Sequence, residues 1–236
     1  MRPFLTAEWT NLVMANYEFD RKLLLKHLPA RTELDTHNGI DYVSLVAFMF
    51  TNTKVLGISI PFHRDFEEIN LRFYVRFKDG GEWKRGVVFI KEIVPNFAIA
   101  FVANTLYGEH YQTLKTAHSW EFLKDEISLE YRWRFKNSWN YIRAVGSKEK
   151  IPLLKGSEEE FIAEHYWGYT RVNSLKTSEY EVKHPTWNIH PLKSFDIKCD
   201  FGALYGAEFK SLESSTPKSV FIADGSAISV MGERKI

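Results

Sequence analysis

The chain has 236 residues, of which 44% are hydrophobic and 26% charged, and its formal net charge is +1. These values are typical of a soluble globular protein with a buried core. A net charge this small excludes the broad positive field that attracts nucleic acid or an anionic membrane surface. The lone cysteine, Cys199, excludes an intramolecular disulfide and a cysteine-based metal cluster, and we expect it to be a small buried apolar side chain.

No segment resembles a targeting or membrane-spanning element. The first residues, MRPFLTAEWT, lack the apolar core of a secretory signal, and the longest apolar run lies at 45–50. That run is far shorter than the roughly 20 residues that cross a bilayer. We therefore expect a cytoplasmic protein without a membrane partner.

The first predicted elements are a strand, a short helix and a longer strand. The first strand is expected at 12–17, and Asp20 is placed to cap a helix at 21–27. The Asn38-Gly39 pair predicts a type I′ hairpin turn, because both central residues of that turn have positive φ. The apolar run after it predicts a strand at 40–50.

The stretch DFEEINLRFYVRF, residues 65–77, alternates between polar and apolar side chains. A period of two over this length predicts a β-strand with one apolar face. The turn residues Asp79-Gly80-Gly81 follow, so we expect this strand and the next to form an antiparallel hairpin. The polar face of the strand consists of Glu68, Asn70, Arg72, Tyr74 and Arg76.

The rest of the chain mixes short helices with further strands. The run NFAIAFVANTLYG favours a buried helix at 96–108 with Gly108 as its C-cap, with a strand as the alternative because Phe, Ile and Val are numerous. Further strands are expected within 111–147. Ser157 and Glu160 form a capping box that predicts a helix at 158–167. Further strands are expected at 176–183 and 220–230, with a helical segment at 200–205. The whole chain, 1–236, is therefore interpreted as one α+β domain of mainly antiparallel strands.

Standard catalytic and metal-binding motifs are missing from the sequence. There is no phosphate-binding Gly-rich loop, no HExxH and no GxSxG. The histidines His63, His110, His118 and His184 are scattered, and histidines in such a pattern are more often surface or singly hydrogen-bonded groups than metal ligands. We expect neither a metal ion nor a cofactor.

The polar face of strand 65–77 has two interpretations. It could be a solvated exterior whose charges discourage aggregation, and alternation alone favours this reading. It could instead line a cavity, where Arg72 would bind a carboxylate with its planar guanidinium, Glu68 would exchange protons and Tyr74 would form a hydrogen bond.

Two other segments carry candidate groups. Residues 104–118 include Tyr107, His110, Tyr111 and Lys115, either as a functional loop or as a connection whose aromatic side chains cover the edge of the core. Residues 182–187, VKHPTW, offer His184 and Trp187 as a stacking wall, although packing is the simpler role for an indole.

Several segments, taken in order, resemble the YqjF-like family of uncharacterised proteins. These segments are NYEFDRKLLLKHLP (16–29), ELDTHNGIDYVSLVAF (33–48), FEEINLRFYV (66–75), GVVFIKEIV (86–94), LYGEHY (106–111) and HPTW (184–187). The EINLRFYV and LYGEHY blocks are the most distinctive. The family is itself similar to acetoacetate decarboxylase.

This resemblance implies a fold and the place of a cavity. The expected fold is an antiparallel sheet rolled into an incomplete cone-shaped barrel with flanking helices, and the expected cavity lies inside the roll. The polar face of strand 65–77 would then turn inward, which reverses the preference drawn from alternation alone.

The decarboxylase chemistry does not transfer with the fold. In that family a lysine of lowered pKa forms a Schiff base with a β-keto acid, and it ends an Arg-Glu, Gly, Pro-Lys pattern. Here Gly108 fits that pattern, but His110 replaces the proline and Tyr111 stands at the lysine position. A phenol cannot form an imine, and Lys115 lies four residues further along the chain.

The sequence therefore predicts a pocket for a small carbonyl or carboxylate compound. Its chemistry, if any, would be acid–base, with Glu68 or His110 as the proton-transfer group and Tyr111 as a hydrogen-bond donor. The expected ligand-binding residues are Asn70, Arg72, Tyr74, Tyr107, Lys115, His184 and Trp187. The alternative is a ligand-binding or regulatory protein that uses the same cavity without turnover, and the sequence makes no prediction about oligomeric state.

Overall fold

The computed structural model describes residues 2–96 and 110–236 and consists mainly of antiparallel strands. The larger sheet contains β1 (Leu5–Glu18), β2 (Glu33–Leu34), β3 (Tyr42–Val55), β4 (Phe66–Asp79), β5 (Glu82–Val94), β6 (Tyr111–Thr113), β10 (Ile151–Pro152), β11 (Trp167–Arg171), β12 (Thr177–Lys183), β13 (Asn188–His190), β15 (Ser219–Val230) and β16 (Arg234–Lys235). The smaller sheet contains β7 (Lys115–Phe122), β8 (Glu126–Phe135), β9 (Ser138–Ser147) and β14 (Leu192–Lys198). The helices within the described residues are α1 (Arg21–Leu24), α3 (Glu158–Ala163), α4 (Phe201–Tyr205) and the 3-10 helix η1 (Ala207–Glu213).

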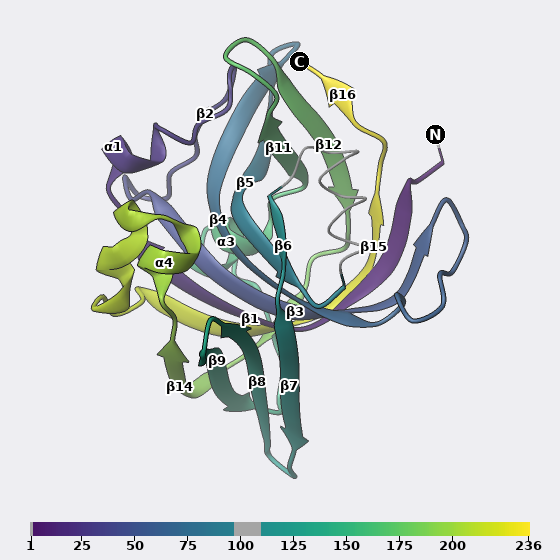
Figure 1. Ribbon diagram of the computed structural model, residues 1–236, viewed down its shortest axis with the longest axis vertical. Coiled ribbons are helices and arrows are strands. Elements are labelled where there is room, and N and C mark those ends of the chain that lie inside the picture. Colours follow the sequence, from purple (N-terminus) through teal and green to yellow (C-terminus); the bar gives the residue numbers. More distant parts are fainter. Residues whose placement is uncertain (1, 97–109) are drawn as a thin grey trace.

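Seven strands close the larger sheet into a ring. Their order is β15-β1-β3-β4-β5-β11-β12, and β12 pairs back onto β15. That closing contact is short, with Val182 opposite Val230 and Lys183 opposite Ser229. Figure 1 shows β3, β4 and β5 curving around a common interior, with the smaller sheet below them. The rolled, mainly antiparallel sheet with few helices confirms the predicted fold.

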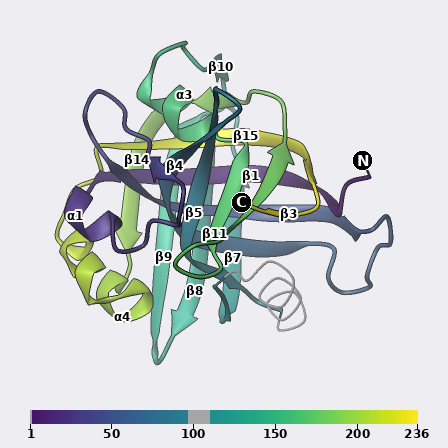
Figure 2. The same ribbon diagram turned by 90° about the horizontal axis from the view of Figure 1, so that it is seen from above.

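The ring has an apolar layer on each side. On the outer side, odd-numbered residues of β4 such as Leu71 and Phe73 pack with β8, β9, α4 and η1. On the inner side, Phe66 and Tyr74 of the same strand pack with Phe161 and neighbouring residues of α3. Figure 2, seen from above, shows α3 and α4 well apart from each other. Since both faces of β4 are covered, neither is available as a solvated exterior.

The predicted hairpin turns are confirmed. Asn38 and Gly39 have φ of 52° and 81°, which are the two positive values that a type I′ turn requires. Gly80 and Gly81 have φ of 58° and 100°, and they join β4 to β5 where Asp79 pairs with Glu82.

Several predicted boundaries are wrong. β1 begins at Leu5 rather than at residue 12, and a bulge between Thr10 and Val13 separates its first half from the predicted segment. β3 begins at Tyr42 and continues to Val55. α1 ends at Leu24, although Asp20 caps it as predicted by accepting from the backbone N–H of Lys22.

The helix that follows the Ser157–Glu160 capping box is also shorter than predicted. The cap is present, because the Ser157 Oγ accepts from the backbone N–H of Glu160 at 3.1 Å. The helix nevertheless ends at Ala163, since residues from Trp167 onward pair with β12 and β5. The helix predicted at 96–108, together with Gly108, lies outside the described residues.

Candidate functional site

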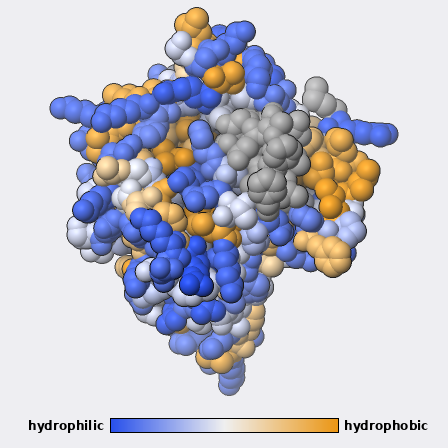
Figure 3. Space-filling view, viewed as in Figure 1, coloured by the Kyte–Doolittle hydropathy of each residue, from blue (hydrophilic) through white to orange (hydrophobic). Residues whose placement is uncertain are grey.

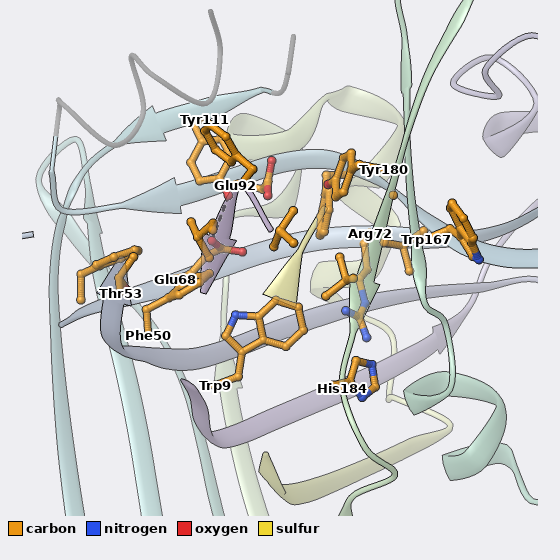
Figure 4. A pocket seen from close by; sticks show the side chains of 18 of the residues that line it. Trp9, Phe50, Thr53, Glu68, Arg72, Glu92, Tyr111, Trp167, Tyr180 and His184 are labelled. Carbon is orange, nitrogen blue, oxygen red and sulfur yellow. Dashed lines mark hydrogen bonds between the residues drawn. The ribbon is translucent and has the colours of Figure 1, made fainter. Parts of the chain in front are cut away.

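A cavity of about 250 Å³ lies inside the ring. Its walls come from all seven ring strands and from the segments after α3 and β12, and most of the lining side chains are apolar or aromatic. Charged or ionisable groups gather at two places on this lining. Figure 4 shows Glu68, Glu92 and Tyr111 grouped at one side and Arg72 near His184 at the other, with Trp9 between the groups.

The β3–β4 connection borders the cavity. Ile60 and His63 from this connection line it, and Ile60 is 46% exposed. Its neighbours Leu56, Ile58 and Phe62 are still more exposed, and Figure 3 shows apolar side chains gathered over this part of the surface. The cavity is therefore bounded on this side by a partly exposed apolar hairpin.

The polar face of β4 points into the ring and is buried. Glu68, Asn70, Arg72 and Tyr74 are all at most 9% exposed. The interpretation as a solvated face is therefore wrong. Glu68 and Arg72 line the cavity, whereas Asn70 and Tyr74 lie behind the lining. Tyr74 shares a hydrogen bond of 2.7 Å with the Ser44 Oγ, so its hydroxyl belongs to the packing of the inner layer.

Glu68 is a buried carboxyl group with two identified hydrogen-bond donors. The Asn70 Nδ2 donates to its Oε1 at 2.9 Å, and the Tyr111 Oη donates to its Oε2 at 3.1 Å. Burial raises the pKa of Glu68 to about 7, while these hydrogen bonds and the Arg72 charge act in the opposite direction. A carboxyl group with a pKa near neutrality can both give and take a proton, which is what general acid–base catalysis requires.

Tyr111 links Glu68 to a second buried acid, Glu92. Glu92 is 2% exposed and also lines the cavity. Burial raises the pKa of Tyr111 well above its usual value, and the Glu68 and Glu92 carboxylates raise it further. Tyr111 is therefore a neutral phenol at pH 7, and its hydroxyl serves as a hydrogen-bond donor.

Arg72 is a buried guanidinium group without a carboxylate partner among residues 2–96 and 110–236. Its Nη2 makes one long hydrogen bond, 3.5 Å to the carbonyl oxygen of Ile162, and its Nε has no partner in this part of the chain. Its Cζ lies 5.7 Å from the centre of the Tyr74 ring. A buried, unpaired guanidinium group in a cavity wall is suited to binding an anion.

His165, which the sequence analysis missed, lies on the lining and is held by Asp35. Its Nε2 is 3.2 Å from the Asp35 Oδ2, which also accepts from the Arg85 Nε at 2.6 Å. Burial opposes the charge of Asp35, but hydrogen bonds from His165 and Arg85 lower its pKa below the usual value. Burial lowers the pKa of His165 to about 4, so the imidazole is neutral at pH 7.

His184 and Trp187 lie in an aromatic stack at the cavity wall. The His184 ring packs against Trp187 at 4.4 Å and against Tyr166 at 4.6 Å between ring centres. Trp187 is buried and its Nε1 donates to the Ser226 Oγ at 2.9 Å. Burial lowers the pKa of His184, which is neutral at pH 7 for the same reason as His165.

Besides Asn70 and Tyr74, three further predicted site residues are not placed on the cavity lining. His110 is exposed, and its backbone oxygen accepts from Glu92 N–H. Lys115 is exposed on β7, with its Nζ 6.0 Å from the centre of the Trp139 ring. Tyr107 lies outside the described residues.

No lysine side chain lines the cavity in the part of the chain that the structure describes, and residues 97–109 contain no lysine. Lys91, next to Glu92 in β5, instead donates to the backbone oxygen of Leu204 near α4. The imine-forming group of a Schiff-base decarboxylase is therefore not matched in this cavity.

The scattered histidines do not gather into a metal site. Among the described residues, no group of three or more His, Cys, Asp or Glu side chains is arranged to hold a metal ion. His118, for example, lies on the smaller sheet with its Nδ1 2.7 Å from Glu67. Cys199 is buried at 8% exposure, as predicted.

Asp35, Glu92 and His165 could not be found from spacing in the sequence. Asp35 and His165 are 130 positions apart and meet only because α3 packs on the inner side of the ring. Glu92 offered a weak signal, because an acid within the apolar run VVFIKEIV is unusual for a strand interior.

Comparison with known proteins identifies the family. A model of the DUF2071 family, described as an uncharacterized conserved protein, matches residues 6–227. The chain belongs to this family. Among curated proteins, this DUF2071 chain is 37% identical over 82 residues to the uncharacterized protein YqjF of Bacillus subtilis (strain 168). That match spans 34% of the chain and 32% of YqjF, about a third of each.

Solved structures similar to the DUF2071 chain include acetoacetate-decarboxylase-like proteins. Acetoacetate decarboxylase from Legionella pneumophila matches with a TM-score of 0.65 at 13% identity, covering 99% of this chain and 87% of that one. The enduracididine biosynthesis enzyme MppR with HEPES bound matches with a TM-score of 0.70 at 12% identity, and the match covers 100% of this chain and 89% of MppR. An acetoacetate decarboxylase-like enzyme from Sphingomonas wittichii RW1 matches with a TM-score of 0.65 at 9% identity, and the match covers 100% of this chain and 94% of that enzyme. At these identities the likeness shows the fold alone.

Within residues 2–96 and 110–236, no helix has the length and apolar character needed to cross a bilayer.

Proposed function

We propose that the protein binds a small carbonyl or carboxylate compound inside the ring and exchanges a proton with it. The observation that carries this proposal is the placement of Arg72 and Glu68 on the same cavity, one as an unpaired cation and the other as a carboxyl group with a pKa near neutrality. Among the structural neighbours, MppR has been solved in complex with pyruvate, a small carboxylate with a carbonyl group.

Each group has a distinct role in the proposal. The Arg72 guanidinium binds the carboxylate of the ligand through charge-assisted hydrogen bonds. Glu68 takes a proton from the carbon next to the ligand's carbonyl and later returns it, and Tyr111 orients the Glu68 carboxyl group by donating to it. Neither step requires an imine, which fits a cavity that no lysine lines among the described residues.

The anion-binding role is tested by calorimetric titration with 2-oxohexanoate. We expect Arg72→Gln to weaken binding by about 10- to 100-fold, the range for a lost hydrogen bond to a charged group. Arg76→Gln is the matched control, because Arg76 lies on the same face of β4 but outside the cavity, where it pairs with Glu33. Equal affinities for the parent and both variants would contradict the proposal.

The proton-transfer role is tested by NMR in D₂O, which follows exchange of the hydrogens next to the ligand's carbonyl. The parent protein should accelerate this exchange, and Glu68→Gln should abolish the acceleration while it still binds the ligand. If the parent protein binds the ligand but does not accelerate hydrogen exchange, the proton-transfer role is wrong and the protein only binds its ligand. As a check on the imine route, borohydride treatment with acetoacetate should leave the protein mass unchanged.

A further inference from the structure

We infer that the ligand is a monocarboxylate with an apolar body of several carbons, larger than a three- or four-carbon keto acid. This inference rests on the proposed function and specifies its ligand class. It follows from the lining of the cavity, from its volume and from the charges that face it.

The lining offers apolar contact on every side of the charged groups. Trp9 lies with its ring centre 5.9 Å from that of Phe50, and Phe50 stacks on Phe66 at 4.7 Å. Val87 and Phe89 of β5 continue this surface across the ring. Because apolar surface gains free energy when it leaves water, this lining favours a ligand that carries apolar surface of its own.

The volume sets an upper limit on that body. A cavity of about 250 Å³ corresponds to roughly eight water molecules at their share of liquid volume. A three-carbon acid bound at Arg72 would leave most of the apolar wall without a contact. A body of a few further methylene groups would extend along that wall until the space is filled.

The charges on the lining limit the ligand to one negative group. Arg72 is the one Arg or Lys side chain on the described part of the lining, and His165 and His184 are both neutral at pH 7. At the other side of the cavity, Glu68 and Glu92 are acids buried to within 3% exposure. A second carboxylate on the ligand would therefore face acids rather than a cation, and burying it unpaired is unfavourable.

The test is a set of calorimetric titrations with straight-chain 2-oxo acids of three, four, six and eight carbons. We expect affinity to rise by about fourfold for each added methylene group until the cavity is full. The dicarboxylate 2-oxohexanedioate, which has as many carbons as 2-oxohexanoate, should bind more weakly than that monocarboxylate.

Two variants separate filling of the cavity from a general effect of chain length. Val87→Phe occupies part of the cavity, so it should weaken binding of the eight-carbon acid at least tenfold and weaken pyruvate binding much less. Ile90 lies on the outward face of the same strand, so Ile90→Phe should leave the affinity for each 2-oxo acid as it is in the parent protein. Thermal melts establish that both variants are folded.

The outcomes distinguish this inference from the proposed function. Equal affinity for acids of all lengths, with Arg72→Gln still weakening each of them, would overturn the apolar ligand class and leave the anion site standing. Tighter binding of the dicarboxylate would also overturn it. If no acid of any length binds, the proposed function itself fails.

Discussion

Glu68 and Arg72 are charged groups that folding removes from water, and neither is fully compensated. Glu68 keeps two hydrogen-bond donors but has a raised pKa, and Arg72 has one long hydrogen bond to a backbone oxygen among the described residues. Groups of this kind reduce the stability of the folded state. They are retained where a ligand supplies the missing interactions, which is why these two residues define the candidate site.

Glu68→Gln should change the pH dependence of stability. The folded pKa of about 7 lies above the usual value of 4.5, so the folded state holds this proton more tightly than the unfolded state. The contribution of the Glu68 proton to the free energy of unfolding is complete below pH 4.5 and is lost as pH rises through 7. In denaturant unfolding, the free energy of unfolding of the variant should therefore be close to that of the parent at pH 4.5 and higher by up to about 3 kcal/mol at pH 9. A constant difference across this range would contradict the raised pKa.

Alternation in residues 65–77 predicted the strand and the parity of its faces, but it could not give the direction of the polar face. Both faces of β4 are buried, and Glu68 and Tyr74 have different surroundings despite equal parity. The direction depends on closure of the ring through β12 and β15, which are far from β4 in the sequence. His165 was missed for the same reason, because its partner Asp35 is supplied by another part of the fold.

At the scale of secondary structure elements, β11 shapes the cavity through a glycine. Gly168 lies so close to β12 that an added Cβ would be 2.1 Å from the Cζ of Tyr180. Tyr180 also lines the cavity. Because Gly168 has no side chain, the Tyr180 ring can pack directly against β11, and this position determines how far the ring extends into the cavity.

Gly168→Ala should displace the Tyr180 ring and reduce the space for a ligand. We expect weaker binding of 2-oxohexanoate and a loss of about 1–2 kcal/mol in the free energy of unfolding, as for other overpacked sites. Gly232→Ala is the control, because its added Cβ meets nothing within 4 Å. Parent-like binding by Gly168→Ala would show that Tyr180 does not limit the cavity.

Elements whose signals are local could be predicted from the sequence, whereas those that depend on distant partners could not. The Asn38-Gly39 turn and the Ser157 cap follow from the residues themselves. The end of α3 at Ala163 does not, because it is set by pairing of Trp167 with Gly86 of β5. The rolled sheet was predicted through resemblance to a family rather than from periodicity.

Across the whole chain, a buried acid attaches the C-terminal strand β16 to the ring. Glu179 of β12 is 0% exposed, and it accepts from the Tyr169 Oη at 3.0 Å, the Lys84 Nζ at 3.3 Å and the Arg234 Nε at 2.5 Å. These partners come from β11, β5 and β16. The charge of Glu179 therefore joins β12 to β5, β11 and β16.

Arg234→Ala should weaken this attachment, because it removes one of the two cations that pair with Glu179. We expect a loss of about 2 kcal/mol in the free energy of unfolding, together with faster amide hydrogen exchange in β12. Lys235→Ala is a matched control in the same strand, since it removes a surface pair with Glu233. Equal effects of the two substitutions would show that Glu179 does not hold β16 against the ring.

A crystal structure of the protein grown with 2-oxohexanoate would show whether Arg72 and Glu68 form one ligand site. We predict the carboxylate inside the ring, roughly 3 Å from the Arg72 guanidinium, with the alkyl chain along Trp9 and Phe50. We expect the keto group on the side of Glu68 and Tyr111. A ligand bound on the outer surface, or inside the ring with its carboxylate away from Arg72, would contradict the proposed binding mode.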